Sequence, residues 1–286
     1  MSRIAYVNGV YVPLRDACVH VEDRGFQFAD GVYEVCEVFG GRLIDETRHL
    51  DRLKRSLSEL GIAMPAGEGA LRVIVRETVR RNRVRDGLVY LQVTRGAARR
   101  DFVFPAADTP PTLVVTARSV DRSKAEAGAA SGISVISLPD NRWERVDIKS
   151  TGLLPNALAR QRAKERGAKE AWFVDKDGYV TEGAASNAWI ITRENTLLTR
   201  PAESGILRGV TRTTLLDLAR RDNLLVSERP FTLAEAKAAK EAFVTAATAL
   251  IMPVVRIDDT TIGDGKPGAL TVRLRARFHE VAERSL

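Results

Sequence analysis

Extended and helical segments alternate along the whole chain, and this alternation constrains the fold more than any other feature. Near the start, two short apolar segments flank Asn8-Gly9, a pair of residues that favours a two-residue hairpin. Residues 32–39 alternate and end at Gly40-Gly41, after which 42–44 return and predict a second hairpin. Strand and helix patterns are mixed in both halves, which predicts a mixed α/β fold and not an array of repeats.

A helix is predicted from Asp45 or Thr47, either of which can cap it, to about Leu60, with Gly61 as its stop. Its leucines, from Leu50 onward, fall on one face. The other predicted strands are 4–7, 10–12, 88–94, 112–117, 133–138, 171–174, 179–180, 188–192 and 242–245. The other predicted helices are 70–82, 155–166, 211–222, 234–240 and a last one that begins near 270.

Residues 119–131 are small and charged and show no apolar stripe, which is typical of a linker between domains. A chain of 286 residues is long enough for two domains with separate cores. We therefore expect a small N-terminal α/β domain over 1–120 and a larger C-terminal domain over 121–286.

The net charge of +7 raises the alternative of a basic nucleic-acid-binding protein. The densest basic group, residues 80–85, is not interleaved with aromatic side chains, so it offers no surface on which bases could stack. A solvated helix face is the preferred interpretation, and no nucleic-acid partner is expected. No apolar run is long enough to span a membrane, and the first residues do not resemble a signal peptide. Cys18 and Cys36 are too few for a disulfide framework and favour a reduced, cytoplasmic protein.

Two apparent ligand motifs have simpler explanations. Glycines within 263–268 have the spacing of a dinucleotide-binding loop, but Pro267 stands where the helix would have to begin. The segment 175–178 resembles the start of a calcium loop, yet the later ligands are missing and a hairpin turn is expected. No metal site is therefore predicted, and any chemistry is expected to depend on an organic cofactor.

Five unusual segments remain, and together they are the most specific signal in the chain. They are 22–35 (EDRGFQFADGVYEV), 48–53 (RHLDRL), 147–150 (DIKS), 181–187 (TEGAASN) and 205–212 (GILRGVTR). In these segments the chain resembles the class IV aminotransferases, the fold-type IV enzymes that use pyridoxal 5′-phosphate, and among them most of all the D-amino-acid aminotransferases. The resemblance covers nearly the whole chain. It implies a smaller N-terminal and a larger C-terminal α/β domain with the cofactor between them.

The resemblance implies that Lys149 is the Schiff-base lysine, which holds the cofactor and moves the proton between the substrate and the cofactor. A strand end is expected to hold its amine in place. Glu182 is implied to keep the pyridine nitrogen protonated, so that the ring can accept electrons. The alternatives are a solvated lysine and a solvent-facing glutamate. The small residues 183–186 favour the cofactor function, because they let the backbone approach a flat ring.

Phosphate binding is implied for Arg52, Val210, Thr211 and Ala247. Arg52 lies away from the leucine stripe, so a surface charge is the alternative. Val210 and Thr211 would begin a helix whose free N–H groups suit an anion, with a plain threonine cap as the alternative. Leu207 is implied to pack on the ring. The family often has hydroxyls at 246 and 247, where this chain has alanines, so weaker binding through the Ala247 backbone is expected.

For the substrate, the resemblance implies that Tyr33 and Arg100 take part in binding, with Arg100 holding the carboxylate from a loop that reaches the other subunit of a homodimer. The family has a histidine two residues after this arginine, and this chain has Phe102, which makes the site more apolar. The implied reaction is a ping-pong transfer from a D-amino acid to a 2-oxo acid. Branched-chain L-amino-acid transamination, (R)-amine transamination and aminodeoxychorismate lyase activity remain alternatives with the same cofactor.

Overall fold

The computed structural model describes residues 3–203 and 205–285, and the chain divides into two units. Unit 1 contains Met1–Asp121, Ile148–Gly152 and Glu283–Leu286, and unit 2 contains Arg122–Asp147 and Leu153–Ala282. Two segments of the expected domain 121–286, one of which carries Lys149, therefore belong to unit 1. The expected linker 119–131 is also different, because most of it forms the helix α4 (Arg122–Ser131).

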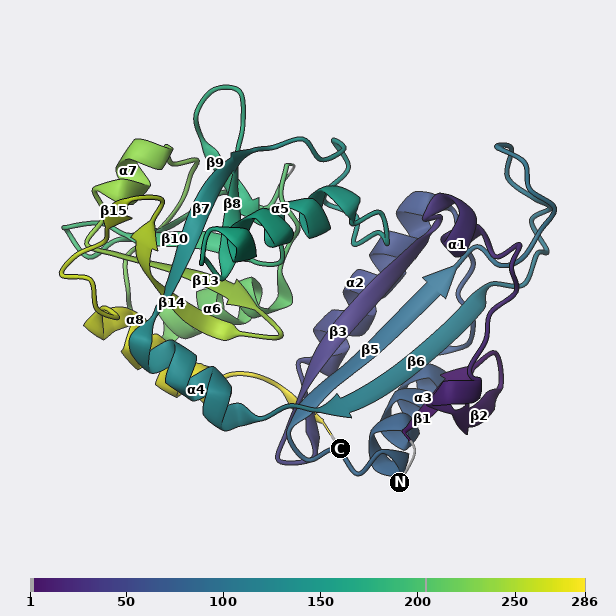
Figure 1. Ribbon diagram of the computed structural model, residues 1–286. Coiled ribbons are helices and arrows are strands. Elements are labelled where there is room, and N and C mark those ends of the chain that lie inside the picture. The colour runs from purple at the N-terminus through teal and green to yellow at the C-terminus, as the bar shows by residue number, and fades with distance from the viewer. Residues whose placement is uncertain (1–2, 204, 286) are drawn as a thin grey trace. The chain divides into compact units, whose positions relative to one another are not determined.

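Unit 1 is built on a seven-stranded sheet with the order β16-β4-β3-β5-β6-β1-β2 (Figure 1). Its strands are β1 (Ile4–Val7), β2 (Val10–Pro13), β3 (Gly31–Phe39), β4 (Arg42–Ile44), β5 (Gly87–Thr94), β6 (Thr112–Ser119) and β16 (Arg284–Ser285). Both predicted hairpins are confirmed, since β1 pairs with β2 and β3 pairs with β4 in antiparallel register. In the first hairpin Asn8 and Gly9 both have positive φ, 44° and 102°, as a tight turn of this kind requires.

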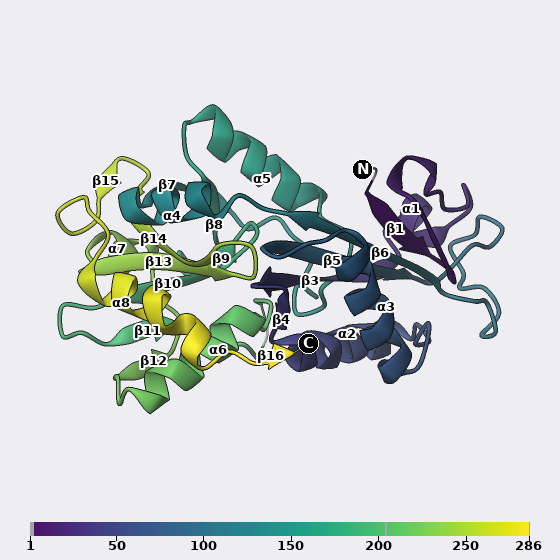
Figure 2. The same ribbon diagram turned by 90° about the horizontal axis from the view of Figure 1, so that it is seen from below.

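Two helices cover one face of this sheet, α2 (Glu46–Leu60) and α3 (Glu68–Arg81), as Figure 2 shows. The predicted leucine stripe is confirmed: Leu53 and Leu57 of α2 are buried in one core with Val32 and Leu91 of the sheet. Asp45 is the N-cap of α2 but makes no side-chain capping hydrogen bond, and Gly61 ends the helix with φ 60°. A 3-10 turn, η1 (Leu14–Asp16), and a short helix, α1 (Arg24–Phe28), complete the unit.

Unit 2 contains a nine-stranded sheet with the order β12-β11-β10-β13-β14-β7-β8-β9, and β15 pairs with β14. Its strands are β7 (Ile133–Pro139), β8 (Glu170–Val174), β9 (Val180–Gly183), β10 (Asn187–Ile191), β11 (Leu197–Thr199), β12 (Val226–Glu228), β13 (Glu241–Ala246), β14 (Leu250–Ile257) and β15 (Thr260–Thr261). Besides α4, its helices are α5 (Leu154–Glu165), α6 (Val210–Arg221), α7 (Leu233–Lys237), α8 (Ala269–Arg277) and the 3-10 turn η2 (Phe278–Glu280).

Both faces of this sheet are buried. Trp172 and Phe173 are neighbours on β8, so they point to opposite faces. Trp172 packs in a core with Phe231, whereas Phe173 packs in a second core with Ala159 and other residues of α5. The predicted mixed α/β fold is confirmed. Within residues 3–203 and 205–285, the structure contains no helix with the length and apolar character that crossing a membrane requires.

Candidate functional site

Lys149 is held through its backbone against strand β3 of unit 1. Its carbonyl accepts a hydrogen bond of 3.0 Å from the Tyr33 N–H, and its own N–H donates to Ser56 Oγ at 3.4 Å. On either side, Ile148 is buried in the core and Ser150 forms an isolated bridge with Val32. Lys149 was expected at the end of a strand, and this is wrong. An isolated bridge at Ser150 and the hydrogen bonds of the Lys149 backbone hold the lysine instead.

The amine of Lys149 lies over an aromatic ring. Its Nζ is 4.2 Å from the ring centroid of Tyr33, and Tyr33 stacks on Tyr90 with 5.6 Å between the ring centroids. The Tyr90 hydroxyl donates to Gln92 Oε1 at 2.6 Å. Burial raises the pKa of Tyr90 to about 12, with a further contribution from Tyr33. The structure thus brings Lys149 and Tyr33 together and backs them with a phenol that stays protonated at neutral pH.

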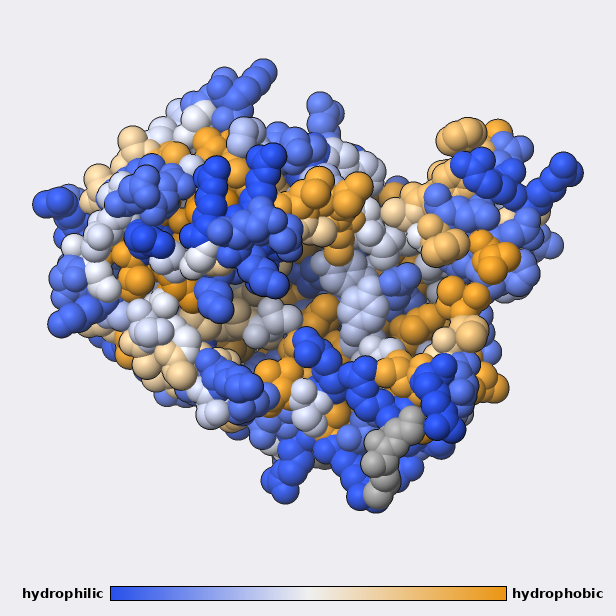
Figure 3. All heavy atoms as spheres, viewed as in Figure 1, coloured by the Kyte–Doolittle hydropathy of each residue, from blue (hydrophilic) through white to orange (hydrophobic). Residues whose placement is uncertain are grey.

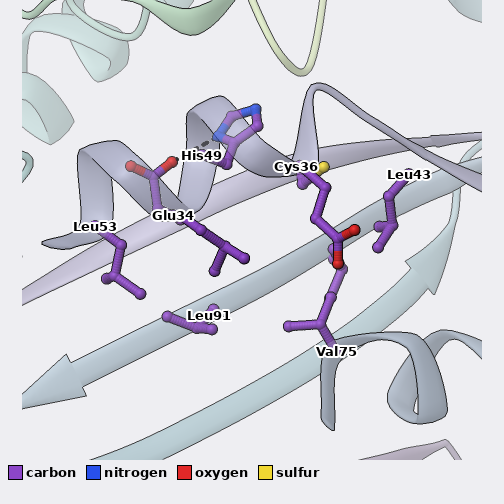
Figure 4. A pocket seen from close by; sticks show the side chains of 10 residues that line it. Glu34, Cys36, Leu43, His49, Leu53, Val75 and Leu91 are labelled. Atoms are coloured by element: carbon purple, nitrogen blue, oxygen red, sulfur yellow. Dashed lines mark hydrogen bonds and ion pairs between the residues drawn. The ribbon is translucent and has the colours of Figure 1, made fainter. Parts of the chain in front are cut away.

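Arg52 is largely covered in an ion pair and is not a surface charge. Its Nε and Nη2 donate to the two carboxylate oxygens of Glu34, each at 2.7 Å, and its side chain is 10 % exposed. His49 Nδ1 lies 2.7 Å from Glu34 Oε2 (Figure 4). Burial opposes the ionisation of Glu34, but the charge and hydrogen bonds of Arg52, followed by those of His49, lower its pKa to about 2. Arg52 is also one helical turn from Ser56, the residue that binds the Lys149 N–H.

A small cavity of about 30 Å³ adjoins this ion pair, on the helix-covered face of the unit 1 sheet. Figure 4 shows Cys36, Leu53, Val75 and Leu91 around it. Neither Tyr33 nor Lys149 lines it. Successive strand residues point to opposite faces, so Glu34 faces this cavity while Tyr33 faces the other side of the sheet. The cavity is therefore separate from the lysine.

Arg100 is exposed on the loop between β5 and β6. Its guanidinium carbon lies 5.0 Å from the ring centroid of Phe28 and 5.8 Å from that of Phe102. In the part of the chain that the structure describes, no contact joins Arg100 to Tyr33 or Lys149. The structure therefore does not bring this predicted residue together with the other two.

Glu182, in unit 2, is a buried carboxylate with three donors. Oε1 accepts from Arg142 Nη1 at 2.5 Å, and Oε2 accepts from Asn187 Nδ2 at 3.0 Å and from the Leu207 N–H at 3.1 Å. Its side chain is 6 % exposed, so the solvent-facing alternative is wrong. Leu207 also accepts a hydrogen bond from Asn187 through its carbonyl, at 2.9 Å. Glu182 and Leu207 are thus brought together, and Asn187 links them.

Arg142 is a residue of this cluster that sequence reasoning missed. It binds Asp140 through Nε and Nη2, at 2.9 and 2.7 Å, and its guanidinium lies 4.6 Å from the ring centroid of Phe173. Burial opposes the charge, but the Asp140 hydrogen bond and the charges of Glu182 and Asp140 raise the pKa of Arg142. Burial likewise opposes ionisation of Asp140, whose pKa is nevertheless lowered by Arg142. One guanidinium charge therefore serves both the buried Glu182 and the half-buried Asp140.

The first turn of α6 begins directly after Gly209, which is its N-cap. Thr211 is consequently not the cap, and the plain threonine-cap alternative is wrong. A side chain at Gly209 would place its Cβ 2.0 Å from Asn187 Oδ1, so a larger residue would have to displace the Asn187 side chain. In the same turn, Arg212 has a buried Nε that finds no partner among the described residues. Ala247 lies apart from this helix in the chain, in the turn between β13 and β14.

These features fit pyridoxal phosphate in three respects. Lys149 offers a primary amine on a fixed backbone, Glu182 a buried carboxylate whose opposing charge is shared, and α6 a helix N-terminus beside an unsatisfied buried N–H. Nowhere in the described part of the chain do three or more His, Cys, Asp or Glu side chains gather in a way that could hold a metal ion.

The chain is similar to known proteins over most of its length. The family model for amino-transferase class IV matches residues 31–257. A D-alanine aminotransferase of Bacillus licheniformis is 41% identical over 264 residues, 92% of each chain. One of Listeria innocua is 39% identical over 275 residues, 96% of this chain and 94% of the relative.

Solved structures have the same fold. The branched-chain amino acid aminotransferase from T.th., solved with pyridoxamine 5′-phosphate, gives a TM-score of 0.89 at 26% identity, over 98% of this chain and 94% of that one. The branched-chain amino acid aminotransferase from Escherichia coli gives 0.89 at 23% identity, with the same coverage of 98% and 94%.

Proposed function

Because the chain belongs to the class IV aminotransferases, we propose that it transfers the amino group of a D-amino acid to a 2-oxo acid with pyridoxal 5′-phosphate as cofactor. The observation that carries the proposal is the position of Lys149, whose amine lies 4.2 Å over the Tyr33 ring while its backbone is fixed on β3. The D-amino-acid preference rests on the 41% identity to a D-alanine aminotransferase. The similarity to branched-chain enzymes is weaker, at 26% identity.

Lys149 performs two tasks in this reaction. When bound, the cofactor supplies an aldehyde and an electron-accepting ring. Lys149 would hold the cofactor through its amine, and when that amine is free it would act as the base that accepts the proton from the substrate Cα. The Tyr33 ring, whose centroid is 4.2 Å from the Lys149 Nζ, packs beside the amine. The hydrogen bonds from the Lys149 backbone to the Tyr33 N–H and to Ser56 Oγ fix the segment of chain that carries the amine.

Glu182 holds the proton on the cofactor's ring nitrogen. Asn187 and the Leu207 N–H orient the carboxylate, and Arg142 divides its charge between Glu182 and Asp140. A carboxylate that is only partly neutralised favours a protonated partner. We assign Leu207 to contact with the ring.

Arg52, Val210, Thr211 and the Ala247 backbone N–H are assigned to the phosphate. Two hydrogen bonds to Glu34 hold the guanidinium of Arg52 in one orientation. The N-terminus of α6 contributes N–H groups and a partial positive charge.

Tyr33 and Arg100 are assigned to the substrate, with Arg100 binding the carboxylate. We also propose a homodimer in which Arg100 serves the partner subunit, since its side chain is exposed on a loop and accessible to another chain. We propose that the protein acts in the cytoplasm, because Cys18 and Cys36 are both free thiols.

A substrate panel tests the proposal. Purified protein with added pyridoxal phosphate is assayed with D- and L-amino acids and (R)-amines, each against pyruvate and 2-oxoglutarate. We expect yellow protein whose visible absorbance changes on addition of D-alanine, and faster turnover of D-alanine than of L-leucine. Faster turnover of L-leucine would show that the D-amino-acid assignment is wrong, and colourless protein that turns over none of them would overturn the function.

A further inference from the structure

Arg100 lies on a long loop, residues 95–111, which we name the arginine loop. The base of this loop is fixed through backbone hydrogen bonds: the Arg24 N–H donates to Gly96 O at 2.9 Å, and the Ala98 N–H donates to Glu22 O at 3.3 Å. Beyond Ala98 the loop has no strand or helix. Most side chains beyond Ala98 are exposed, Phe102 by 80 % and Phe104 by 60 %. Figure 3 shows apolar side chains among charged ones where this loop forms the surface, at the upper right.

Three arginines and three phenylalanines, from this loop and from helix α1, stack alternately. Arg95 lies over Phe104 at 3.7 Å from guanidinium carbon to ring centroid, and Arg24 lies over the same ring at 5.6 Å. Arg24 also lies over Phe28 at 4.7 Å. Arg100 continues the stack over Phe28 and Phe102, whose rings are 5.6 Å apart. The stack therefore runs from buried Arg95 to exposed Arg100.

Arg24 is the only arginine of this described stack whose side chain also bonds the loop backbone near Arg100. Its Nη1 donates to Asp101 O at 2.7 Å and, more weakly, to Val103 O at 3.5 Å. Those two carbonyls flank Phe102. The Arg24 side chain is 4 % exposed, and its Nε donates to Asp30 Oδ2 at 2.8 Å. Asp30 in turn pairs with Arg95 at 2.7 Å, so Arg24 is anchored to a rigid, buried pair.

We propose that Arg24 is a positioning residue that sets where Arg100 lies, and so determines how tightly the substrate carboxylate is bound. The inference rests on the proposed function, because it takes Arg100 as the carboxylate-binding group. A guanidinium is suited to this task, since it can donate to two carbonyls, pair with a carboxylate and stack on two rings at once. A lysine can keep the pair with Asp30 but cannot make the other contacts in the same geometry.

Variants of Arg24 test the inference by separating binding from catalysis. We expect R24M to raise the KM for D-alanine by about ten- to a hundred-fold, because a misplaced binding group loses affinity steeply, while kcat changes far less. R24K should lie between R24M and the unaltered protein. In both variants Asp30 can still form its ion pair with Arg95. Cofactor binding, measured by the visible absorbance of the bound cofactor, should therefore be unchanged.

Two controls keep this test specific. R99A removes a neighbouring exposed charge of the same loop and should leave KM within about two-fold, since surface substitutions without contacts have small effects. F104L removes the ring that lies between Arg24 and Arg95, at an exposed position. It can replace R24M in the test if R24M does not fold, and its KM for D-alanine should rise by several-fold.

Hydrogen exchange of the loop amides gives a readout that does not depend on activity. In R24M the amides of residues 99–104 should exchange faster than in the unaltered protein, whereas in R99A they should not. Unchanged KM and unchanged exchange in R24M or F104L would overturn the inference. An unaltered protein that binds no cofactor or transfers no amino group would instead overturn the proposed function, and the exchange experiment would still decide whether Arg24 holds the loop.

Discussion

Lys149 and Tyr33 are joined twice: the Lys149 carbonyl accepts the Tyr33 N–H at 3.0 Å, and the Lys149 amine lies 4.2 Å from the Tyr33 ring centroid. The first contact involves only backbone, so it persists in variants of Tyr33. The second requires an aromatic ring. Position 33 can therefore be changed without releasing the lysine backbone.

Substitutions at Tyr33 should separate the ring from its hydroxyl. Y33F keeps the ring face, so we expect it to retain cofactor binding and the stack on Tyr90. Y33L loses both ring contacts and should lower the free energy of unfolding by about 1–2 kcal/mol, with a lower turnover. Urea unfolding and steady-state kinetics measure both effects. Equal behaviour of Y33F and Y33L would show that the ring face plays no part.

Glu182 and Asp140 both pair with Arg142, but replacing them should have unequal effects. E182Q removes the charge assigned to the ring nitrogen, so turnover should fall by at least about a hundred-fold. D140N removes the other partner of Arg142 and should lower turnover far less. If both variants lose activity equally, the charge at Glu182 has no special role.

Replacing Arg142, the cation that pairs with Glu182 and Asp140, should change the stability of the protein. R142M leaves the buried Glu182 and the half-buried Asp140 without their cation, which should destabilise the protein by about 3–5 kcal/mol. R142K keeps a charge and should cost less. Urea unfolding of the two variants measures the difference, and equal stability of R142M and the unaltered protein would contradict the ion pairs.

Glu34 predicts a pH dependence of stability. Its pKa is about 2 in the folded protein against an ordinary value of 4.5. Because the folded pKa is the lower one, the contribution is fully present above about pH 4.5 and is lost as the pH falls toward 2. It amounts to about 3 kcal/mol by linkage. Unfolding measured from pH 6 to pH 3 should therefore show a steeper loss in the unaltered protein than in E34Q, and parallel curves would contradict the shift.

The C-terminal segment makes further contacts that should stabilise unit 1. Glu283 binds the N–H of Thr47 at 3.1 Å, and Ser285 Oγ donates to the buried Glu46 at 2.6 Å. Ending the chain after Ala282 removes β16 and should lower the free energy of unfolding by about 1–3 kcal/mol. S285A removes only the Glu46 bond and should have the smaller effect. An unchanged unfolding midpoint in the truncated chain would contradict this.

Local patterns predicted much of the fold. Asn8-Gly9 and Gly40-Gly41 mark two hairpins that the structure confirms, because their turn geometry depends on the turn residues themselves. The short strands β11 and β12 were missed, since three residues carry too little periodicity. The helix α4 was missed because its small and charged residues bury only Ala129.

Site residues that lie in a family motif could be predicted from the sequence. Site residues whose position depends on a partner far away in the sequence could not. Lys149 and Glu182 lie in recognisable segments, but the burial of Arg52 depends on Glu34 from another element, which a helical pattern of leucines does not reveal. Arg142 reaches Glu182 across 40 residues of sequence. Lys149 belongs to unit 1 for a similar reason: its hydrogen bonds to Tyr33 and Ser56 cross far more sequence than a boundary drawn along the chain allows.

Borohydride reduction followed by peptide mapping tests the role of Lys149 most directly. Protein incubated with pyridoxal phosphate is reduced and digested with trypsin, and K149A is treated in parallel. We expect the mass of the reduced cofactor on a peptide that spans 146–160, because a labelled Lys149 is no longer cleaved, and no label in K149A. A cofactor label on a different lysine, or full amino-transfer activity in K149A, would contradict the assignment of Lys149.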